Sequence, residues 1–96
     1  LGRPRHFILA QNYPNPFNGD TVVRFILPAA ATVDLVVYSS AGQRVATLME
    51  GARAYGHHQV RWDGRDTDGN RLASGVYFYR LRAADQVQVR KLILLR

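Results

Sequence analysis

Residues 76–96 read VYFYRLRAADQVQVRKLILLR, and apolar and polar side chains alternate on both sides of Ala84-Asp85. A period of two is typical of strands that bury one face. The side chains expected to be buried are Tyr77, Tyr79, Leu81, Val87 and Val89. The stretch therefore predicts an antiparallel hairpin that turns at Ala84-Asp85, with Arg80, Arg82 and Arg90 on one outward face.

Residues Lys91 to Arg96 break this alternation. Four aliphatic side chains, Leu92 to Leu95, follow one another between two cations, whereas order and apolar content usually fade at chain ends. We therefore expect the run to form the last core strand, to be displayed to a partner that recognises it, or both. Because Lys91 and Arg96 are charged, we expect neither to be fully buried. Replacing either with alanine should change the free energy of unfolding by less than about 0.5 kcal/mol.

Period-two patterns recur towards the N-terminus, and short strands are expected over residues 6–10, 21–27, 32–39 and 44–49 and from His58 to Trp62. Their expected core-facing side chains are Val23, Phe25, Leu27, Val33, Leu35, Val37, His58, Val60 and Trp62. Loops rich in Gly, Pro, Asn and Asp separate the strands, and no segment combines an amphipathic helical period with helix caps. The chain is therefore predicted to be all-β, an immunoglobulin-like antiparallel β-sandwich of about seven strands.

Aromatic residues suit the core of such a sandwich. Trp62 ends a middle strand, and the Tyr77 hydroxyl is expected to bond back to the connection that precedes it. The motif Asn15-Pro16-Phe17 predicts a turn with an anchoring ring. Pro16 disfavours a helical conformation at Asn15, and Phe17 can fill the end of the sandwich.

Length and composition limit the classes of function. With 96 residues, 47% of them hydrophobic, and no cysteine, the chain suits one domain without thiol chemistry. No apolar run approaches the roughly 18 residues of a membrane span. The net charge of +6 comes mostly from scattered arginines without recognition-helix or finger spacing, so a solvated basic face is expected rather than nucleic-acid binding. Residues 1–8 are expected to be a linker remnant cut from a longer chain, and residues 9–96 the domain.

An acidic loop is the strongest candidate for a metal site. Asp66, Asp68 and Asn70 lie in a glycine-containing turn that is similar to the start of a calcium-binding loop. The region in which such a loop needs a bidentate carboxylate, residues 71–75, contains no acid. Because Asx and glycine residues form tight turns unaided, an ordinary turn is favoured over a weak calcium site, and no cofactor is predicted.

Other constellations argue against catalysis. His57 and His58 are adjacent, so on a strand they point to opposite faces and cannot bind one metal together. Ser74 lacks the strained elbow of a hydrolase nucleophile, no glycine-rich phosphate loop is present, and the carboxylates that a hydrolase would need crowd one loop beside Arg65 and Arg71. The chain is therefore predicted not to be an enzyme. Core packing is favoured over a sugar-binding platform for the aromatic residues Tyr13, Phe17, Trp62, Tyr77, Phe78 and Tyr79.

Short motifs occur in a family-like order along the chain. They are residues 11–18 (QNYPNPFN), 25–28 (FILP), 36–38 (VVY) with Gly42, 56–58 (GHH), 62–66 (WDGRD), 73–81 (ASGVYFYRL) and 90–96 (RKLILLR). Each is weak alone, but jointly they are specific. From about Leu9 to Arg96 the chain resembles the type A C-terminal sorting domain of the type IX secretion system, a family related to the immunoglobulin-like domain of flagellar hook-capping proteins.

The resemblance implies a module at the C-terminus of a larger secreted protein of Gram-negative bacteria, which directs that protein through an outer-membrane translocon. The implied partners are translocon components, a sortase-like protease and the N-terminal cargo domains, with no nucleic acid and no membrane insertion. The implied destination is the cell surface or the medium, by way of the periplasm.

The resemblance assigns translocon recognition to Lys91, Leu92, Ile93, Leu94, Leu95 and Arg96, to which the charge pattern of the hairpin adds Arg80, Arg82 and Arg90. The signature and structural positions are Asn15, Pro16, Phe17, Gly42, Trp62, Gly75 and Tyr77. Two alternatives stay open. One is a passive immunoglobulin-like spacer or glycan-binding accessory module of a cell-surface enzyme, and the other is a small hydrolase.

Overall fold

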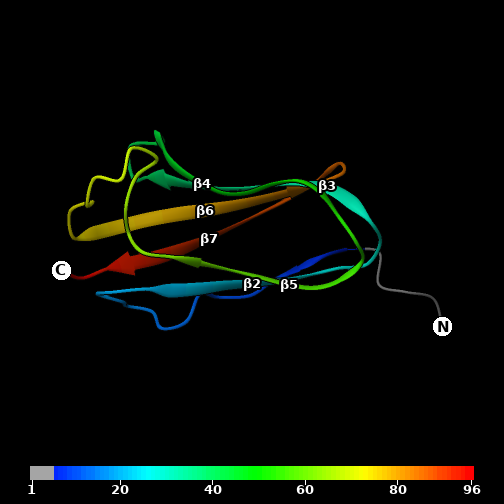
Figure 1. The fold of residues 1–96 in the computed structure, drawn as a ribbon, viewed down its shortest axis with the longest axis horizontal. Helices are drawn as coiled ribbons and strands as arrows, with labels where there is room; N and C mark the ends of the chain where they lie inside the picture. Colours follow the sequence, from blue (N-terminus) through cyan, green and yellow to red (C-terminus); the bar gives the residue numbers. More distant parts are fainter. Residues whose placement is uncertain (1–5) are drawn as a thin grey trace.

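The computed structural model describes residues 6–96, in which two antiparallel sheets pack face to face (Figure 1). The strands are β1 (Ile8–Leu9), β2 (Thr21–Leu27), β3 (Ala31–Ser39), β4 (Arg44–Arg53), β5 (Gly56–Trp62), β6 (Gly75–Ala83) and β7 (Gln86–Leu94). One sheet has the order β1-β2-β5 and the other the order β4-β3-β6-β7. The predicted all-β, immunoglobulin-like sandwich of about seven strands is confirmed.

Alternation along the strands places the core between the sheets. Val23, Phe25 and Leu27 of β2 are buried, as are Val33, Leu35 and Val37 of β3, which confirms the predicted inward faces of both strands. Removing an aliphatic or aromatic side chain of this size from water stabilises the fold by roughly 1.5–3 kcal/mol. Among the described residues, no helix is present that is long and apolar enough to cross a membrane.

Strand β4 is longer than expected. It continues beyond Met49 to Arg53 because β3 pairs with it throughout, from Tyr38 opposite Arg44 to Ala31 opposite Arg53. Two register shifts interrupt this pairing, and such bulges hide the alternation from a simple count along the sequence.

The side of the sandwich where β1 faces β7 is closed by polar side chains. Gln88 of β7 reaches across to β1, where its Oε1 accepts from the Leu9 N–H (3.3 Å) and its Nε2 donates to the Phe7 carbonyl (2.9 Å). The Phe7 N–H donates to Gln86 Oε1 at 3.3 Å. These bonds satisfy backbone groups of a strand edge that would otherwise be open to pairing with another chain.

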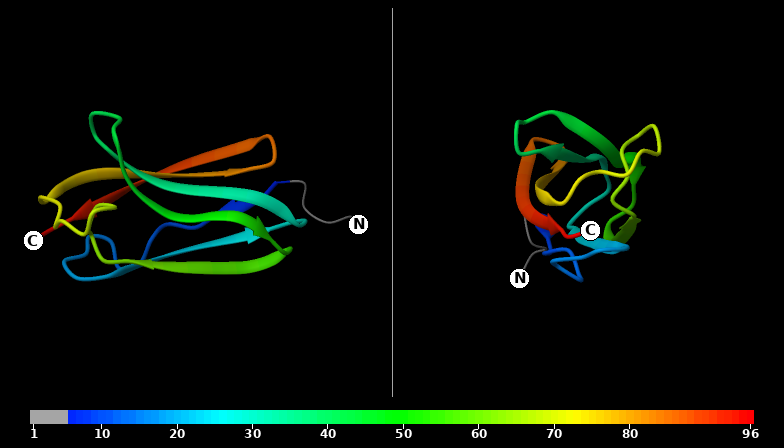
Figure 2. Two further views of the ribbon diagram at one scale, coloured as in Figure 1. Left: turned by 45° about the horizontal axis from the view of Figure 1, so that its top comes forward. Right: turned by 90° about the vertical axis from the view of Figure 1, so that its left-hand side faces the viewer.

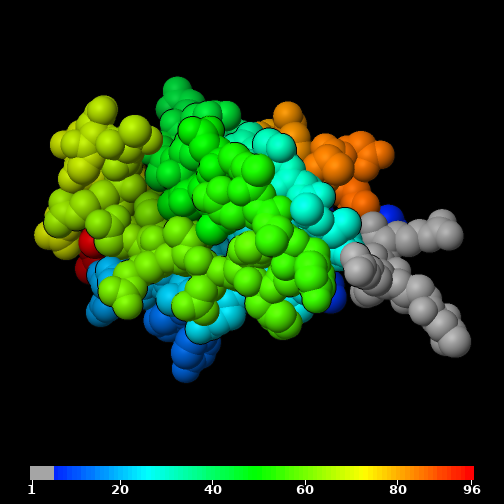
Figure 3. Space-filling view, turned by 45° about the vertical axis from the view of Figure 1, so that its right-hand side comes forward, coloured from blue at the N-terminus to red at the C-terminus, as the bar shows by residue number. Residues whose placement is uncertain are grey.

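The opposite side of the sandwich is closed by two consecutive strands and the connection between them. Strands β4 and β5 lie side by side there and form the continuous green surface in Figure 3. The short connection at residues 54–55 passes from one sheet to the other. Residues 6–8 run into β1, and Phe7 is already buried. The rest of the predicted linker, residues 1–5, lies outside the described residues, so the domain boundary at residue 9 stays a prediction.

Candidate functional site

Motifs that are far apart in the sequence meet at the end of the sandwich where the chain finishes (Figure 2, right). We call this the C-terminal surface, made by residues 13–20, 63–74 and 94–96. Phe17 pairs with the end of β7, donating its N–H to the Ile93 carbonyl (3.0 Å) and accepting from the Leu95 N–H (2.8 Å). Asn15 Oδ1 accepts from the Ile93 N–H at 2.9 Å. The two sequence signatures thus form one structural unit.

The Phe17 ring is the anchor of this unit. It is 3% exposed, and its centroid lies 5.7 Å from that of Trp62. The prediction that Asn15-Pro16-Phe17 forms a turn with an anchoring ring is confirmed. The peptide bonds before Pro14 and Pro16 are both cis.

The terminal run divides between two faces of the sheet. Leu92 and Leu94 are fully buried, whereas Lys91 and Leu95 are exposed and Ile93 lies between these extremes. The apolar run that interrupts the sequence pattern after Lys91 therefore still alternates between buried and more exposed side chains in the structure. Leu92 and Leu94 belong to the expected core strand, and Lys91 and Leu95 are the side chains that the segment exposes.

The predicted faces of the preceding residues were inverted. Val87 and Val89 are 49% and 55% exposed, and they pair with Arg82 and Arg80 on the outward side of the sheet. Arg90 pairs instead with the buried Tyr79, and its Nε donates to the Leu9 carbonyl at 2.6 Å. A shift of one residue moves every side chain of a strand to the other face, so the prediction that Arg80, Arg82 and Arg90 share one outward face is wrong.

The outward cations of the hairpin differ in availability. Arg80 forms an ion pair with Asp34 at 3.6 Å and lies over the Tyr38 ring, 5.1 Å from its centroid. Only 22% of its side chain is exposed. Arg82 and Lys91 are exposed on the same face. They are the two exposed basic groups that the hairpin contributes to this face.

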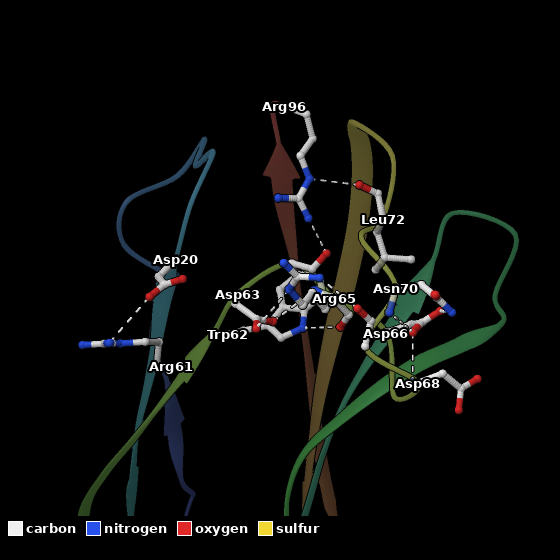
Figure 4. A network of polar contacts seen from close by, with 12 residues as sticks. Asp20, Arg61, Trp62, Asp63, Arg65, Asp66, Asp68, Asn70, Leu72 and Arg96 are labelled. Carbon is white, nitrogen blue, oxygen red and sulfur yellow. Dashed lines mark hydrogen bonds and ion pairs between the residues drawn. The ribbon is translucent and has the colours of Figure 1, made fainter.

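Arg96 is held by the connection between β5 and β6 (Figure 4). Its guanidinium donates from Nη2 to the Gly64 carbonyl (2.6 Å) and from Nε to the Leu72 carbonyl (3.1 Å). Its backbone N–H donates to Ser74 Oγ at 2.7 Å. A Cβ at position 64 would lie 2.8 Å from Arg96 Nη2, so glycine makes the approach possible. The expectation that Arg96 is as dispensable for stability as Lys91 no longer holds.

We expect Arg96→Ala to lower the free energy of unfolding by about 1–2 kcal/mol, because it removes two hydrogen bonds from a charged donor. The melting temperature should fall by at least about 4 °C in a domain of this size. Arg96→Lys should restore only part of the loss, since an ammonium lacks the planar fork of donors. Lys91→Ala is the matched control, and equal melting curves for the two alanine variants would contradict the assignment.

The acidic loop is an Asx turn. Asp66 Oδ1 accepts from the Asp68 N–H (3.0 Å) and the Asn70 N–H (2.9 Å), so this carboxylate is engaged by its own loop. Within residues 6–96 no group of three or more His, Cys, Asp or Glu side chains is placed to hold a metal ion. The ordinary turn, favoured on sequence, is what the structure contains.

We expect millimolar calcium to leave the melting temperature unchanged within about 1 °C, because a ligand stabilises a fold only in proportion to its binding. Scanning calorimetry with calcium and with chelator measures this directly. Asp68→Asn should behave like the parent chain in both conditions. A calcium-dependent rise of several degrees that this variant abolishes would instead establish a site at Asp66, Asp68 and Asn70.

The remaining signature residues, Tyr77, Trp62, Gly42 and Gly75, lie in the core, in a turn or at the start of a strand. The Tyr77 hydroxyl donates to the Ala73 carbonyl at 2.7 Å, which confirms the expected bond back to the preceding connection. Trp62 is 4% exposed, and its Nε1 donates to the Arg65 carbonyl at 2.9 Å. Gly42 has a φ of 83° in the turn between β3 and β4, a conformation that favours glycine. Gly75 begins β6.

The sugar-binding platform loses most of its aromatic surface. Phe17, Trp62, Tyr77 and Tyr79 are buried in the core, whereas Tyr13 is 73% exposed. Core packing, the favoured interpretation, is confirmed for these four. The Tyr79 hydroxyl donates to the Ala10 carbonyl (2.7 Å) and accepts from the Asn12 N–H (2.8 Å), and burial raises the pKa of Tyr79. This ring ties the N-terminal segment to β6.

The adjacent histidines point apart, as expected. His57 is exposed on the outer face of its sheet, opposite Ile26, and His58 stacks on Phe25 with a centroid separation of 5.2 Å. His58 Nε2 lies 2.7 Å from the Ala54 carbonyl. The two rings therefore do not form a common metal site.

Solved structures contain similar folds. PorU from Porphyromonas gingivalis, crystallised as a latent dimer, matches 96% of this chain with a TM-score of 0.74 and 18% identity. PorZ, described as an essential bacterial surface component of the type IX secretion system of the same organism, matches 90% with a TM-score of 0.63 and 21% identity. The matched parts are 10% of the PorU chain and 11% of the PorZ chain, so the present chain spans about a tenth of either.

A flagellar protein shares more of its length and sequence. FlgD from Xanthomonas campestris, described in connection with the hook capping that is essential for flagellar assembly, matches 92% of this chain and 66% of its own, with a TM-score of 0.62 and 26% identity. Among curated proteins, no sequence matches this chain. The family model of the FlgD Ig-like domain matches residues 11–86, which confirms the relationship that the sequence motifs indicated. The chain belongs to the family of FlgD Ig-like domains.

Proposed function

We propose that this chain is a non-catalytic C-terminal module that directs a larger exported protein through an outer-membrane type IX translocon to the cell surface or medium. The observation that carries the proposal is that two distant motifs form one hydrogen-bonded unit, in which the turn at Asn15–Phe17 is bonded to residues 93–95. A signal that is read after export needs a defined shape at its end, and this unit supplies one. The similarity of the fold to domains of PorU and PorZ also supports a role in type IX secretion.

The proposed contact residues are those that the fold leaves accessible. Lys91 and Leu95 project from the end of β7, and Leu95 is 52% exposed beside the turn. Arg82 extends the same basic face. Of the other residues assigned to recognition, Leu92 and Leu94 fill the core, and Arg96 positions the end of the strand. The partners of the module would be translocon components, a sortase-like protease and the N-terminal cargo domains, met by way of the periplasm.

The test is a reporter fusion. A fluorescent reporter with its own export signal is joined to residues 6–96, which include the buried Phe7, in a host that has the translocon. The reporter is then measured in the periplasm, on the cell surface and in the medium. The intact module should send it to the surface or medium. Lys91→Ala and Leu95→Ser should retain it in the periplasm while changing the free energy of unfolding by less than about 0.5 kcal/mol, as expected for exposed sites.

The control is Arg24→Ala, which removes an exposed cation from β2 in the other sheet and should leave export intact. If the intact fusion stays in the periplasm of a competent host, the sorting proposal fails and a passive spacer takes its place. If export is normal for both Lys91→Ala and Leu95→Ser, the recognised surface lies elsewhere on the module.

A further inference from the structure

A second surface lies on the outer face of the three-stranded sheet. Two adjoining grooves run over β1, β2 and β5, with volumes of about 470 and 190 Å³, and they share Ile8 and Ile26 as lining residues. The larger volume is in the range of small-ligand and side-chain pockets. Because Ile26 is near the Leu27 end of β2 and Thr21 begins the strand beside Trp62, the grooves lie away from the C-terminal surface.

The lining of the grooves is apolar with a basic margin. Ile8 is 54% exposed and Tyr55 is 64% exposed, and solvent-exposed apolar side chains that gather beside a groove mark interaction sites. Arg24 is exposed at one end of the larger groove. No Asp or Glu lines either groove, and β1, β2 and β5 contain none.

We propose that the paired grooves bind an extended acidic peptide segment of a partner protein, with an aliphatic or aromatic side chain inserted between Ile8, Ile26 and Tyr55. A carboxylate of the segment pairs with Arg24, whose guanidinium suits bidentate contacts. Arg24 lies in β2, and Pro28, which lines the smaller groove, directly follows the last residue of that strand. The two residues are four positions apart, which at about 3.3 Å per residue is about 13 Å. The carboxylate and the apolar anchor of the peptide are therefore about four residues apart.

Charge selects this occupant over a second copy of the chain. Each copy carries a net charge of +6 and presents Arg24 from grooves that no carboxylate lines, so two such surfaces repel each other. An anionic membrane is flat and satisfies the charge but leaves the concave grooves unfilled. The proposal goes beyond the sorting function, because it concerns a different sheet and stands whether or not the C-terminal surface is read.

The experiment is a nuclear magnetic resonance titration of the isotope-labelled 96-residue chain. The probe is a synthetic peptide, Ser-Glu-Glu-Ser-Gly-Ser-Leu-Phe-Ser, and its partner has lysine in place of both glutamates. With the acidic peptide we expect saturable chemical-shift changes of the backbone amides around Ile8, Arg24, Ile26 and His57. The lysine peptide should cause no such changes. Raising the salt concentration should weaken binding, because the pairing with Arg24 is exposed to screening.

Two variants at exposed positions assign the contacts. Arg24→Gln and Ile8→Ser should each raise the dissociation constant at least about fivefold, which corresponds to about 1 kcal/mol. Arg82→Gln, which removes a cation from the other sheet, should leave it unchanged. The proposal is overturned by any of four results: no saturable binding up to about 1 mM, equal binding of the lysine peptide, shifts centred on β6 and β7, or binding to phosphatidylglycerol vesicles at this face without binding to the peptide.

Discussion

Removing residues 91–96 is expected to unfold the domain. Leu92 and Leu94 are fully buried, and truncating one buried leucine costs about 2–5 kcal/mol. The deletion also removes the bonds of Arg96 to the 63–74 connection and those of Phe17 to residues 93 and 95. A domain of this size has a total stability of about 5–15 kcal/mol, so the sum of these losses is comparable to all of it.

Circular dichroism during heating gives the readout, and the truncated chain should show no cooperative transition above room temperature. Leu95→Ala is the control within the same segment, because its side chain is half exposed and its replacement should cost within about 0.5 kcal/mol. A truncated chain that melts cooperatively within a few degrees of the parent would contradict the core role of this segment. The result matters for function, since failure of export after deletion would report unfolding rather than loss of recognition.

Trp62→Ala is expected to destabilise the domain by about 3–5 kcal/mol, the range for emptying a buried aromatic site. The indole packs between Phe17 and Tyr77, with ring centroids 5.7 and 6.2 Å away, and its N–H satisfies the Arg65 carbonyl. The site therefore joins the turn at residues 15–17 to the connection before β6. The melting temperature should fall by more than about 12 °C.

Two further variants separate the contributions at this site. Trp62→Phe keeps a ring but lacks the donor to Arg65, and should cost less than Trp62→Ala by at least about 1 kcal/mol. Tyr13→Ala removes an aromatic ring that is 73% exposed and should leave the melting curve nearly unchanged. If Trp62→Ala behaves like Tyr13→Ala, the indole does not support the C-terminal surface as the geometry indicates.

The features that could be predicted from the sequence are those that depend on neighbouring residues. The turn at Asn15-Pro16-Phe17, the Tyr77 hydroxyl bond and the inward faces of β2 and β3 follow from residue types and spacing over a few positions. The extension of β4 over residues 50–53 was missed because these residues look like a loop in the sequence, and only their pairing with β3 makes them part of the strand. The hydrogen bonds of Gln86 and Gln88 to the N-terminal segment were not predicted. The sequence signal for them is weak, since it consists only of two glutamines that alternate with valines.

The partners of the charged residues could not be predicted from neighbouring positions in the sequence. Arg80, Arg90 and Arg96 all looked like exposed cations, yet one pairs with Asp34, one with the Leu9 carbonyl and one with two carbonyls of a distant connection. None of these partners lies within 20 positions of its arginine in the sequence. Lys91 and Arg82 kept the exposed, outward positions that the charge pattern indicated, as did Arg24 and Arg61 on the other sheet.

Sequence alone was sufficient for the fold class and the approximate strands, because a period of two and turn-forming residues act within a few residues of one another. The family was indicated separately, by the resemblance of the short motifs taken together. Tertiary structure decided which face of β7 meets the core, which cations remain accessible, and that the turn at residues 15–17 supports the end of the chain. Those outcomes depend on register between strands, and register is set by the combined packing of both sheets. A one-residue shift inverts every side chain of a strand, so only the assembled sandwich determines which residues are presented to a partner.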